Sequence, residues 1–168
     1  DKAMVVMATG LGKTYLAAFF ARHFKRVLFV AHRDEILQQA KAAFTHVYPE
    51  RSAGFYNGVE KSLDAEMTFA SIYTIAQKSH LQRFMHDAFD LIVVDEFHHA
   101  AAPTYNRLIE YFEPQFMLGI TATPDRLDNK DVYAICDGNI AFEFHFLEAI
   151  AHKWLSPFHY YGVKDDID

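Results

Sequence analysis

A short stretch near the start of the chain, Met4–Tyr15 (MVVMATGLGKTY), combines residue types that are suited to binding phosphate. An apolar run leads into a turn that contains glycines, and a helical pattern follows the turn. Backbone N–H groups in such a turn converge on one point, where the helix adds the positive end of its dipole. Lys13 adds a full charge, and the hydroxyl of Thr14 can ligate Mg²⁺. The stretch therefore predicts a site for the phosphates of a nucleoside triphosphate.

The turn Ala8–Thr14 (ATGLGKT) ends in the Gly-Lys-Thr of a P-loop, whose full pattern is G-x-x-x-x-G-K-[ST]. The first glycine of that pattern falls at position 7, where this chain has Met7. An ordinary turn between a strand and a helix is the alternative interpretation. The residues expected to contact the phosphates are Thr9, Gly10, Leu11, Gly12, Lys13, Thr14 and Tyr15.

Two adjacent carboxylates, Asp95 and Glu96, follow the strongest strand signal in the chain, Leu91–Val94 (LIVV). A Mg²⁺-nucleotide site needs a carboxylate at the end of such a strand to hold the metal. It also needs a base that orients or deprotonates the attacking water. Asp95, with Thr14, suits the first role and Glu96 the second. Two solvated acids at the start of a loop are the alternative, which the phosphate-binding turn disfavours.

The elements expected around these residues alternate between strands and helices. This alternation predicts an α/β fold with a doubly wound parallel sheet, in which ligands bind at the carboxyl ends of the strands. Strands are expected at residues 4–7, 27–31, 54–56, 67–70, 91–94, 116–120, 140–144 and 157–163. Helices are expected at about 14–24, 34–46, 71–78 and 146–153, and from Pro103 onward.

Length and composition set the class of protein. The 168 residues suit one domain, and a hydrophobic content of 51% indicates a folded chain. No apolar run approaches the ~20 residues of a membrane span, and no signal peptide is recognised. The single cysteine, Cys136, excludes an internal disulfide and fits a reducing cytoplasm, which is the expected location. The net charge of -6 argues against a highly basic nucleic-acid clamp, but it permits a few local phosphate contacts.

Several motifs, in the same order, resemble those of the superfamily 2 helicases and translocases. In that superfamily the first glycine of motif I is often replaced, which accounts for Met7. The match runs from Met4 to about Arg126. The matching segments are Ala8–Thr14 (motif I), Ala31–Arg33 (motif Ia), Phe69–Thr74 (the next nucleic-acid-contacting motif), Asp95–His98 (DEFH, a DExH box) and Thr121–Thr123 (motif III).

The resemblance implies a three-layer RecA-like P-loop domain that uses ATP and Mg²⁺, with Lys13, Asp95 and Glu96 as its catalytic residues. His98, Thr121 and Thr123 would hydrogen-bond between neighbouring strands and couple the nucleotide state to the grip on nucleic acid. Arg33, Ser71 and Thr74 would contact the sugar–phosphate backbone of one strand, which gives grip without sequence readout.

The resemblance also implies that residues 1–168 are the N-terminal ATP-binding domain of a larger motor. A second RecA-like domain in the same parent chain would supply the arginine finger, and about 153–168 would begin the crossing to it. The segment Trp154–Asp168 is most similar to bacterial restriction-type (Res subunit-like) helicases, some of which carry a fused nuclease.

Three functions remain open at this point. The first is the motor domain of an ATP-dependent DNA helicase or translocase, an ATP hydrolase that is nearly inactive as an isolated fragment. A nucleotide-binding module without a nucleic-acid role is the second, supported by the acidic net charge. An RNA helicase is the third, although the DEFH spelling of Asp95–His98 departs from the DEAD box typical of RNA unwinders.

The adjacent histidines His98 and His99 and the basic segment Lys78–Arg83 are not assigned to a functional site. A zinc site at His98 and His99 is disfavoured, because adjacent histidines point in different directions and no second ligand pair has zinc spacing. The segment Lys78–Arg83 is mildly basic and is interpreted as a solvated face.

Overall fold

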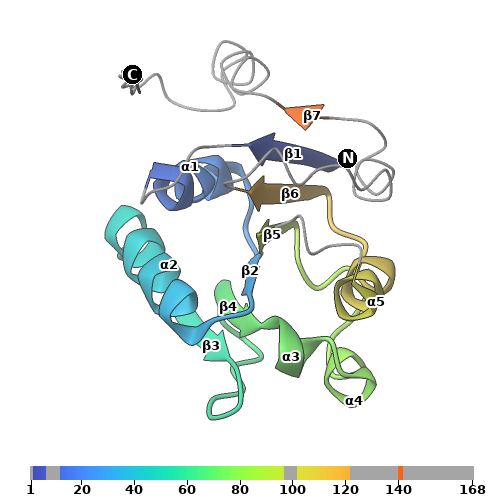
Figure 1. Ribbon diagram of the computed structural model, residues 1–168. Helices are drawn as coiled ribbons and strands as arrows, with labels where there is room; N and C mark the ends of the chain where they lie inside the picture. The colour runs from blue at the N-terminus through green and yellow to red at the C-terminus, as the bar shows by residue number, and fades with distance from the viewer. Residues whose placement is uncertain (1, 7–11, 97–101, 122–139, 142–168) are drawn as a thin grey trace.

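Seven parallel strands form one sheet in the part of the chain that the computed structural model describes, residues 2–6, 12–96, 102–121 and 140–141 (Figure 1). Their order across the sheet is β3-β4-β2-β5-β6-β1-β7, and every neighbouring pair is parallel. The predicted doubly wound parallel sheet is therefore confirmed. The strands are β1 (Lys2–Val6), β2 (Val27–Ala31), β3 (Ala53–Tyr56), β4 (Met67–Ser71), β5 (Leu91–Asp95), β6 (Phe116–Thr121) and β7 (Ile140–Ala141).

Strands β2 and β5 are buried at every position, because helices cover both faces of the sheet. Nearly unbroken apolar sequences such as VLFVA are typical of parallel strands in this situation. Successive side chains of a strand point to opposite faces. Val27 and Phe29 therefore enter one core, and Leu28 and Val30 enter the other.

Helices α1 (Gly12–Phe20) and α2 (Asp34–Val47) cover the first of these faces (Figure 1). The core beneath α2 contains an aromatic group formed by Phe29, Phe44 and Phe69, whose ring centroids lie 5.4 to 6.0 Å apart. These contacts fix α2 against β2 and β4. They therefore also position the short segment that joins the end of β2 to α2.

The opposite face is covered by α3 (Ile72–Ile75), α4 (Lys78–Leu81) and α5 (Pro103–Tyr111) (Figure 1). Pro103 begins α5, as predicted, because its fixed φ and missing N–H suit the first turn of a helix. The buried side chain of Leu108 joins this core, which also includes Leu28 and Val30.

Two predicted helices differ from the observed ones. The segment predicted as one helix over 71–78 forms α3 and α4 instead, because Gln77 between them is extended (φ -67°, ψ 138°). Ser71 belongs to β4 rather than to a helix. Helix α1 ends at Phe20, short of the predicted residue 24, and the chain continues as the 3-10 turn Ala21–His23.

Other predictions fall wholly or partly outside the described residues. The strand predicted at 140–144 is described over Ile140–Ala141, and the predicted elements at 146–153 and 157–163 lie outside, as does Met7. Within the described ranges, no helix is both long enough and apolar enough to cross a membrane.

Two buried tyrosines on the α3–α5 side of the sheet differ in how their hydroxyls are satisfied. Tyr56 Oη lies 2.7 Å from His80 Nδ1 and accepts a hydrogen bond from Arg83 Nη1 at 3.1 Å. Tyr105 Oη is buried and has no hydrogen-bond partner among the described residues. Burial is also the main reason why the pKa of Tyr105 is strongly raised.

We expect Tyr105→Phe to raise the free energy of unfolding by about 1 kcal/mol, because it removes a buried hydroxyl that gains no hydrogen bond. Tyr56→Phe, the matched control, should lower that free energy by about 1 kcal/mol, because its hydroxyl has two partners. Urea unfolding of both variants measures the difference. Equal losses in the two variants would show that the Tyr105 hydroxyl is satisfied in solution.

Candidate nucleotide-binding site

The carboxyl ends of the central strands bring together residues that are far apart in the sequence. In the register of the sheet, Asp95 at the end of β5 pairs with Ile120 of β6, and Ile120 pairs with Val5 of β1. Helix α1 begins at Gly12, shortly after β1. Ligands of doubly wound sheets bind at this edge, so the phosphate-binding stretch and the two carboxylates face one site.

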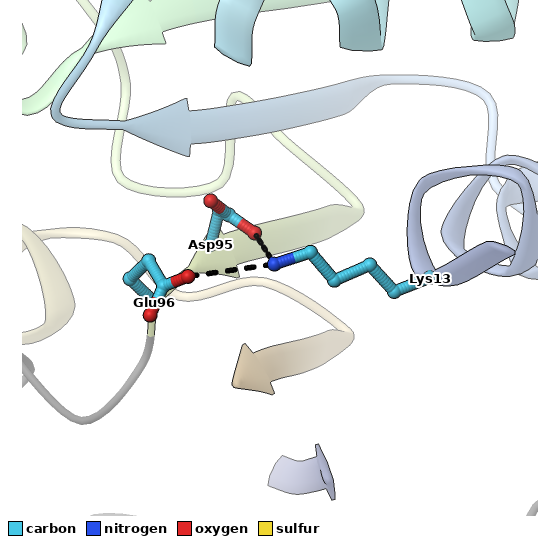
Figure 2. Close-up of polar contacts among 3 residues, drawn as sticks. All are labelled: Lys13, Asp95 and Glu96. Carbon is cyan, nitrogen blue, oxygen red and sulfur yellow. Dashed lines mark hydrogen bonds and ion pairs between the residues drawn. The ribbon is translucent and has the colours of Figure 1, made fainter. Parts of the chain in front are cut away.

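Lys13 is the centre of this site (Figure 2). Its Nζ lies 3.3 Å from Oδ1 of Asp95 and 3.4 Å from Oε1 of Glu96, although 83 positions separate Lys13 from Glu96. The side chains of Lys13, Asp95 and Glu96 are 15%, 3% and 21% exposed, so the three charges are largely shielded from solvent. The predicted association of these three residues is present.

Glu96 has a left-handed backbone with φ 54°, the one non-glycine residue with positive φ among those described. Successive residues of a strand point to opposite faces, so an extended Glu96 would direct its carboxylate away from that of Asp95. The left-handed turn instead lets both carboxylates reach the same ammonium group. Such a conformation costs energy in a residue with a Cβ and is found preferentially at functional sites.

Burial dominates the electrostatics of Asp95. Desolvation raises the pKa of its carboxyl group, the nearby ammonium of Lys13 lowers it, Glu96 raises it, and His32 lowers it. The net effect is a raised pKa, which shows that the positive charges around Asp95 do not fully compensate for its burial. An ionised carboxylate in this position is stabilised by any further cation that enters the site.

The oxygen donors of this site fit Mg²⁺ bound together with phosphates. The hydroxyl-bearing Thr14, in the first turn of α1, is buried, and the carboxylate of Asp95 is at the same edge of the sheet. No group of three or more His, Cys, Asp or Glu that could hold a metal occurs in the described ranges. Mg²⁺ typically takes one or two protein carboxylates and completes its shell with substrate phosphates and water, which suits this sparse set.

The rest of the predicted phosphate-binding stretch is only partly described. Gly12 is the first residue of α1, and Tyr15 is in the same helix. The ring of Tyr15 packs edge-on against His46 of α2, with centroids 6.4 Å apart, so its side chain is engaged between the two helices. Thr9, Gly10 and Leu11 lie outside the described residues.

The predicted coupling residues are described in part. Strand β6, which ends at Thr121, lies between β1 and β5, as the resemblance implied. Thr121 pairs with Val6 of β1. His98 and Thr123 lie outside the described residues, so the hydrogen bond expected between these strands stays a prediction.

The three predicted nucleic-acid contacts lie at or just after the ends of the neighbouring strands β2 and β4. Ser71, the last residue of β4, pairs with Ala31, the last residue of β2. Arg33 is exposed and precedes α2, while Thr74 is half-buried in α3. The structure therefore places all three beyond or at the carboxyl ends of β2 and β4, on the same edge of the sheet as Asp95.

Sequence reasoning missed two groups near the carboxylates. His32 directly follows β2 and lowers the pKa of Asp95, and its position immediately after an apolar strand was the available signal. Tyr105 lies in the electrostatic field of Asp95 and Glu96, both of which contribute to its raised pKa. In the sequence, Tyr105 belongs to the apolar stripe of α5, so it is predicted as a core residue and not as a neighbour of the carboxylates.

A parallel sheet with a lysine from the first helix against paired carboxylates from a central strand defines a RecA-like P-loop domain. The family model described as "Type III restriction enzyme, res subunit" matches residues 1–126. The chain belongs to this family, and its fold is that of the first RecA-like domain of superfamily 2 helicases.

Known relatives agree with this assignment. The chain is 30% identical over 165 residues to "Putative mitochondrial ATP-dependent helicase irc3" of Schizosaccharomyces pombe, covering 90% of this chain and 27% of that protein. It is 29% identical over 161 residues to "DNA 3'-5' translocase XPB2" of Sulfurisphaera tokodaii, covering 94% and 35%. The chain thus spans about a third or less of the length of these relatives.

A solved structure shows the same fold. The helicase domain of Hef from Pyrococcus furiosus superposes with a TM-score of 0.66 at 23% identity, covering 84% of this chain and 34% of that chain.

Proposed function

We propose that this chain is the ATP-binding motor domain of a DNA helicase or translocase that hydrolyses ATP with Mg²⁺. The observation that carries the proposal is the contact of Lys13 Nζ with both Asp95 and Glu96 at the carboxyl edge of the sheet. Family membership and relatives named as ATP-dependent helicases support ATP as the nucleotide.

The roles of the site residues follow from their charges and positions. Lys13 would leave the carboxylates and stabilise the β- and γ-phosphates, because a triphosphate offers it a larger negative charge. Thr14 and Asp95 would hold Mg²⁺, which would supply positive charge to the phosphates of the nucleotide. Glu96, freed from Lys13 and held by its left-handed backbone, would accept a hydrogen bond from the attacking water and position it for the γ-phosphate.

The proposal includes a second RecA-like domain in the same parent chain. Stabilising the charge that develops on the γ-phosphate takes positive groups on more than one side of it. Lys13 is the cation that the described residues place against the two carboxylates. Relatives about three to four times as long leave room for an arginine-bearing second domain.

DNA is the favoured nucleic acid. One relative is named a DNA 3'-5' translocase, and a structure with the same fold, a SWI2/SNF2 ATPase core with a TM-score of 0.59, is described in complex with dsDNA. A relative named as a putative RNA helicase, 28% identical over 130 residues, supports the RNA alternative. Contact would be made with the sugar–phosphate backbone through Arg33, Ser71 and Thr74.

The test is the ATPase rate of the full-length protein without nucleic acid and with single-stranded DNA, duplex DNA or RNA. We expect DNA to stimulate hydrolysis. Stimulation by RNA alone would favour an RNA helicase. The same rate under all four conditions would overturn the nucleic-acid role and favour a nucleotide-binding module.

A further inference from the structure

An exposed aromatic side chain, Tyr73, lies among the residues proposed to contact nucleic acid. It is the second residue of α3, between Ser71 at the end of β4 and Thr74 in the same helix. Tyr73 is 63% exposed, whereas its apolar neighbours Ile72 and Ile75 are fully buried. The contacts proposed above leave this ring unused.

The fold holds the ring of Tyr73 in solvent. Ile72 and Ile75 are three positions apart, so they share one face of α3, and that face enters the core. Tyr73 points off this face, because successive residues of a helix are rotated by about 100°. Within the described ranges, no aromatic ring or cationic side chain packs on Tyr73. Its ring therefore offers a flat apolar face that no described residue stacks on.

The position of α3 places this ring at the carboxyl edge of the sheet, near the nucleotide site. Helix α3 follows β4 directly and packs against α5 (Figure 1). The buried Tyr105, in the first turn of α5, has a pKa that is raised mainly by burial, next by Tyr73, and then by Asp95 and Glu96. Tyr105 is therefore near both the exposed ring and the two carboxylates.

A neutral aromatic face suits a nucleic-acid base rather than a phosphate. Phosphates are held by cations, N–H groups and hydroxyls, which Arg33, Ser71 and Thr74 would supply. Every base has a π-face, and proteins that hold single strands combine backbone contacts with aromatic rings on which bases stack. In a duplex the bases are stacked on one another, and taking one out costs free energy. The free face of Tyr73 is therefore matched to a strand whose bases are unpaired.

We propose that Tyr73 stacks on an unpaired base of the strand whose backbone contacts Ser71 and Thr74. This inference rests on the proposed function and narrows its substrate to nucleic acid with a single-stranded segment at this edge of the sheet. Since every base can stack, the contact would hold the strand without reading its sequence.

The test is equilibrium binding of the full-length protein and its Tyr73→Ala variant to two oligonucleotides of equal length, an oligothymidylate and the same backbone without bases. We expect Tyr73→Ala to bind the oligothymidylate about 5- to 100-fold more weakly, which is the usual loss when one stacking ring is removed. The slope of log K against log salt concentration should not change, because a neutral ring releases no counterions. The base-free oligonucleotide should bind equally to both proteins.

Tyr73→Phe and Met85→Ala are the controls. Phenylalanine keeps the ring, so Tyr73→Phe should bind like the wild-type protein; a loss as large as that of Tyr73→Ala would assign the contact to the hydroxyl and overturn stacking. Met85 is another exposed apolar side chain, at 73%. It lines a pocket with Arg26 and Asp90, which directly precede β2 and β5 and so lie at the opposite edge of the sheet. Met85→Ala should leave binding unchanged.

The outcomes separate this inference from the proposed function. Equal binding of the oligothymidylate by wild type and Tyr73→Ala overturns the stacking contact and leaves the proposed function standing. Normal binding with slower ATP hydrolysis also overturns it, and would place Tyr73 against the second domain instead. A wild-type protein that binds no nucleic acid overturns the proposed function and this inference with it. Should Tyr73→Ala fail to fold, Tyr73→Gln, which keeps a long side chain without a ring, takes its place with the same expected loss.

Discussion

Glu96→Gln in the full-length protein is expected to retain ATP binding and to lose hydrolysis by a factor on the order of 10² to 10⁴. Glutamine keeps the length of the side chain and incurs the same left-handed backbone strain, so the geometry of the turn is preserved. It cannot accept a proton from water at neutral pH. The contact of Lys13 with Asp95 remains, so the phosphate-binding group stays in place.

The measurement pairs ATP affinity with single-turnover hydrolysis in the presence of DNA. Glu110→Gln is the control, because Glu110 is an exposed acid on α5 and the substitution is chemically identical. Hydrolysis at the wild-type rate in Glu96→Gln would remove Glu96 from the chemistry. An equal loss in Glu110→Gln would point to a general effect of lost negative charge.

Local sequence patterns predict the buried framework well, because burial on both faces leaves a plain signal. The observed bounds of β2 are those predicted, Val27–Ala31, and β5 extends its prediction by one residue to Asp95. Strand β3 is short, and its burial alternates because it lies at the edge of the sheet, so its signal was weak. The break between α3 and α4 comes from the extended backbone of Gln77, which no residue type in that segment announces.

The candidate site also has a part that the sequence predicts and a part that it does not. Lys13, Asp95 and Glu96 could be predicted as partners, because each type has a defined role in phosphate chemistry and each follows an apolar strand or turn. The left-handed φ of Glu96 could not be predicted, because it depends on how β5 leaves the sheet. The setting of Tyr105 beside these carboxylates is a tertiary effect, because it brings together segments that show no such relation in the sequence.

Lys13→Ala is expected to have two separate effects. ATP hydrolysis should fall on the order of 10²-fold or more, because the β- and γ-phosphates lose a positioned positive charge. The nucleotide-free protein should also lose about 2 kcal/mol of stability at neutral pH, because a buried carboxylate loses its nearest cation. Lys41→Ala, a half-buried lysine that packs on an aromatic ring, is the control for removing a lysine side chain.

The second effect depends on pH in a direction set by Asp95. Burial already raises the pKa of this carboxyl group, and Lys13 is the largest influence that lowers it, so the pKa should rise further in Lys13→Ala. An acid whose pKa is higher in the folded protein binds more protons there than in the unfolded chain. Its contribution to stability is present at low pH and is lost as the pH rises through the folded pKa. The difference in stability between wild type and Lys13→Ala should therefore be small in acid and grow toward neutral pH.

The double variant Lys13→Ala/Asp95→Asn separates the two effects. Asparagine has about the size of aspartate but no charge to desolvate, so the stability lost in Lys13→Ala should be recovered and its growth with pH should disappear. ATP hydrolysis should not recover, because the phosphates still lack Lys13 and Mg²⁺ has lost a carboxylate ligand. Urea unfolding across the pH range without nucleotide or magnesium measures the first effect, and ATPase assays measure the second. A stability loss that persists unchanged in the double variant would show that Lys13 supports the fold by packing rather than by its charge on Asp95.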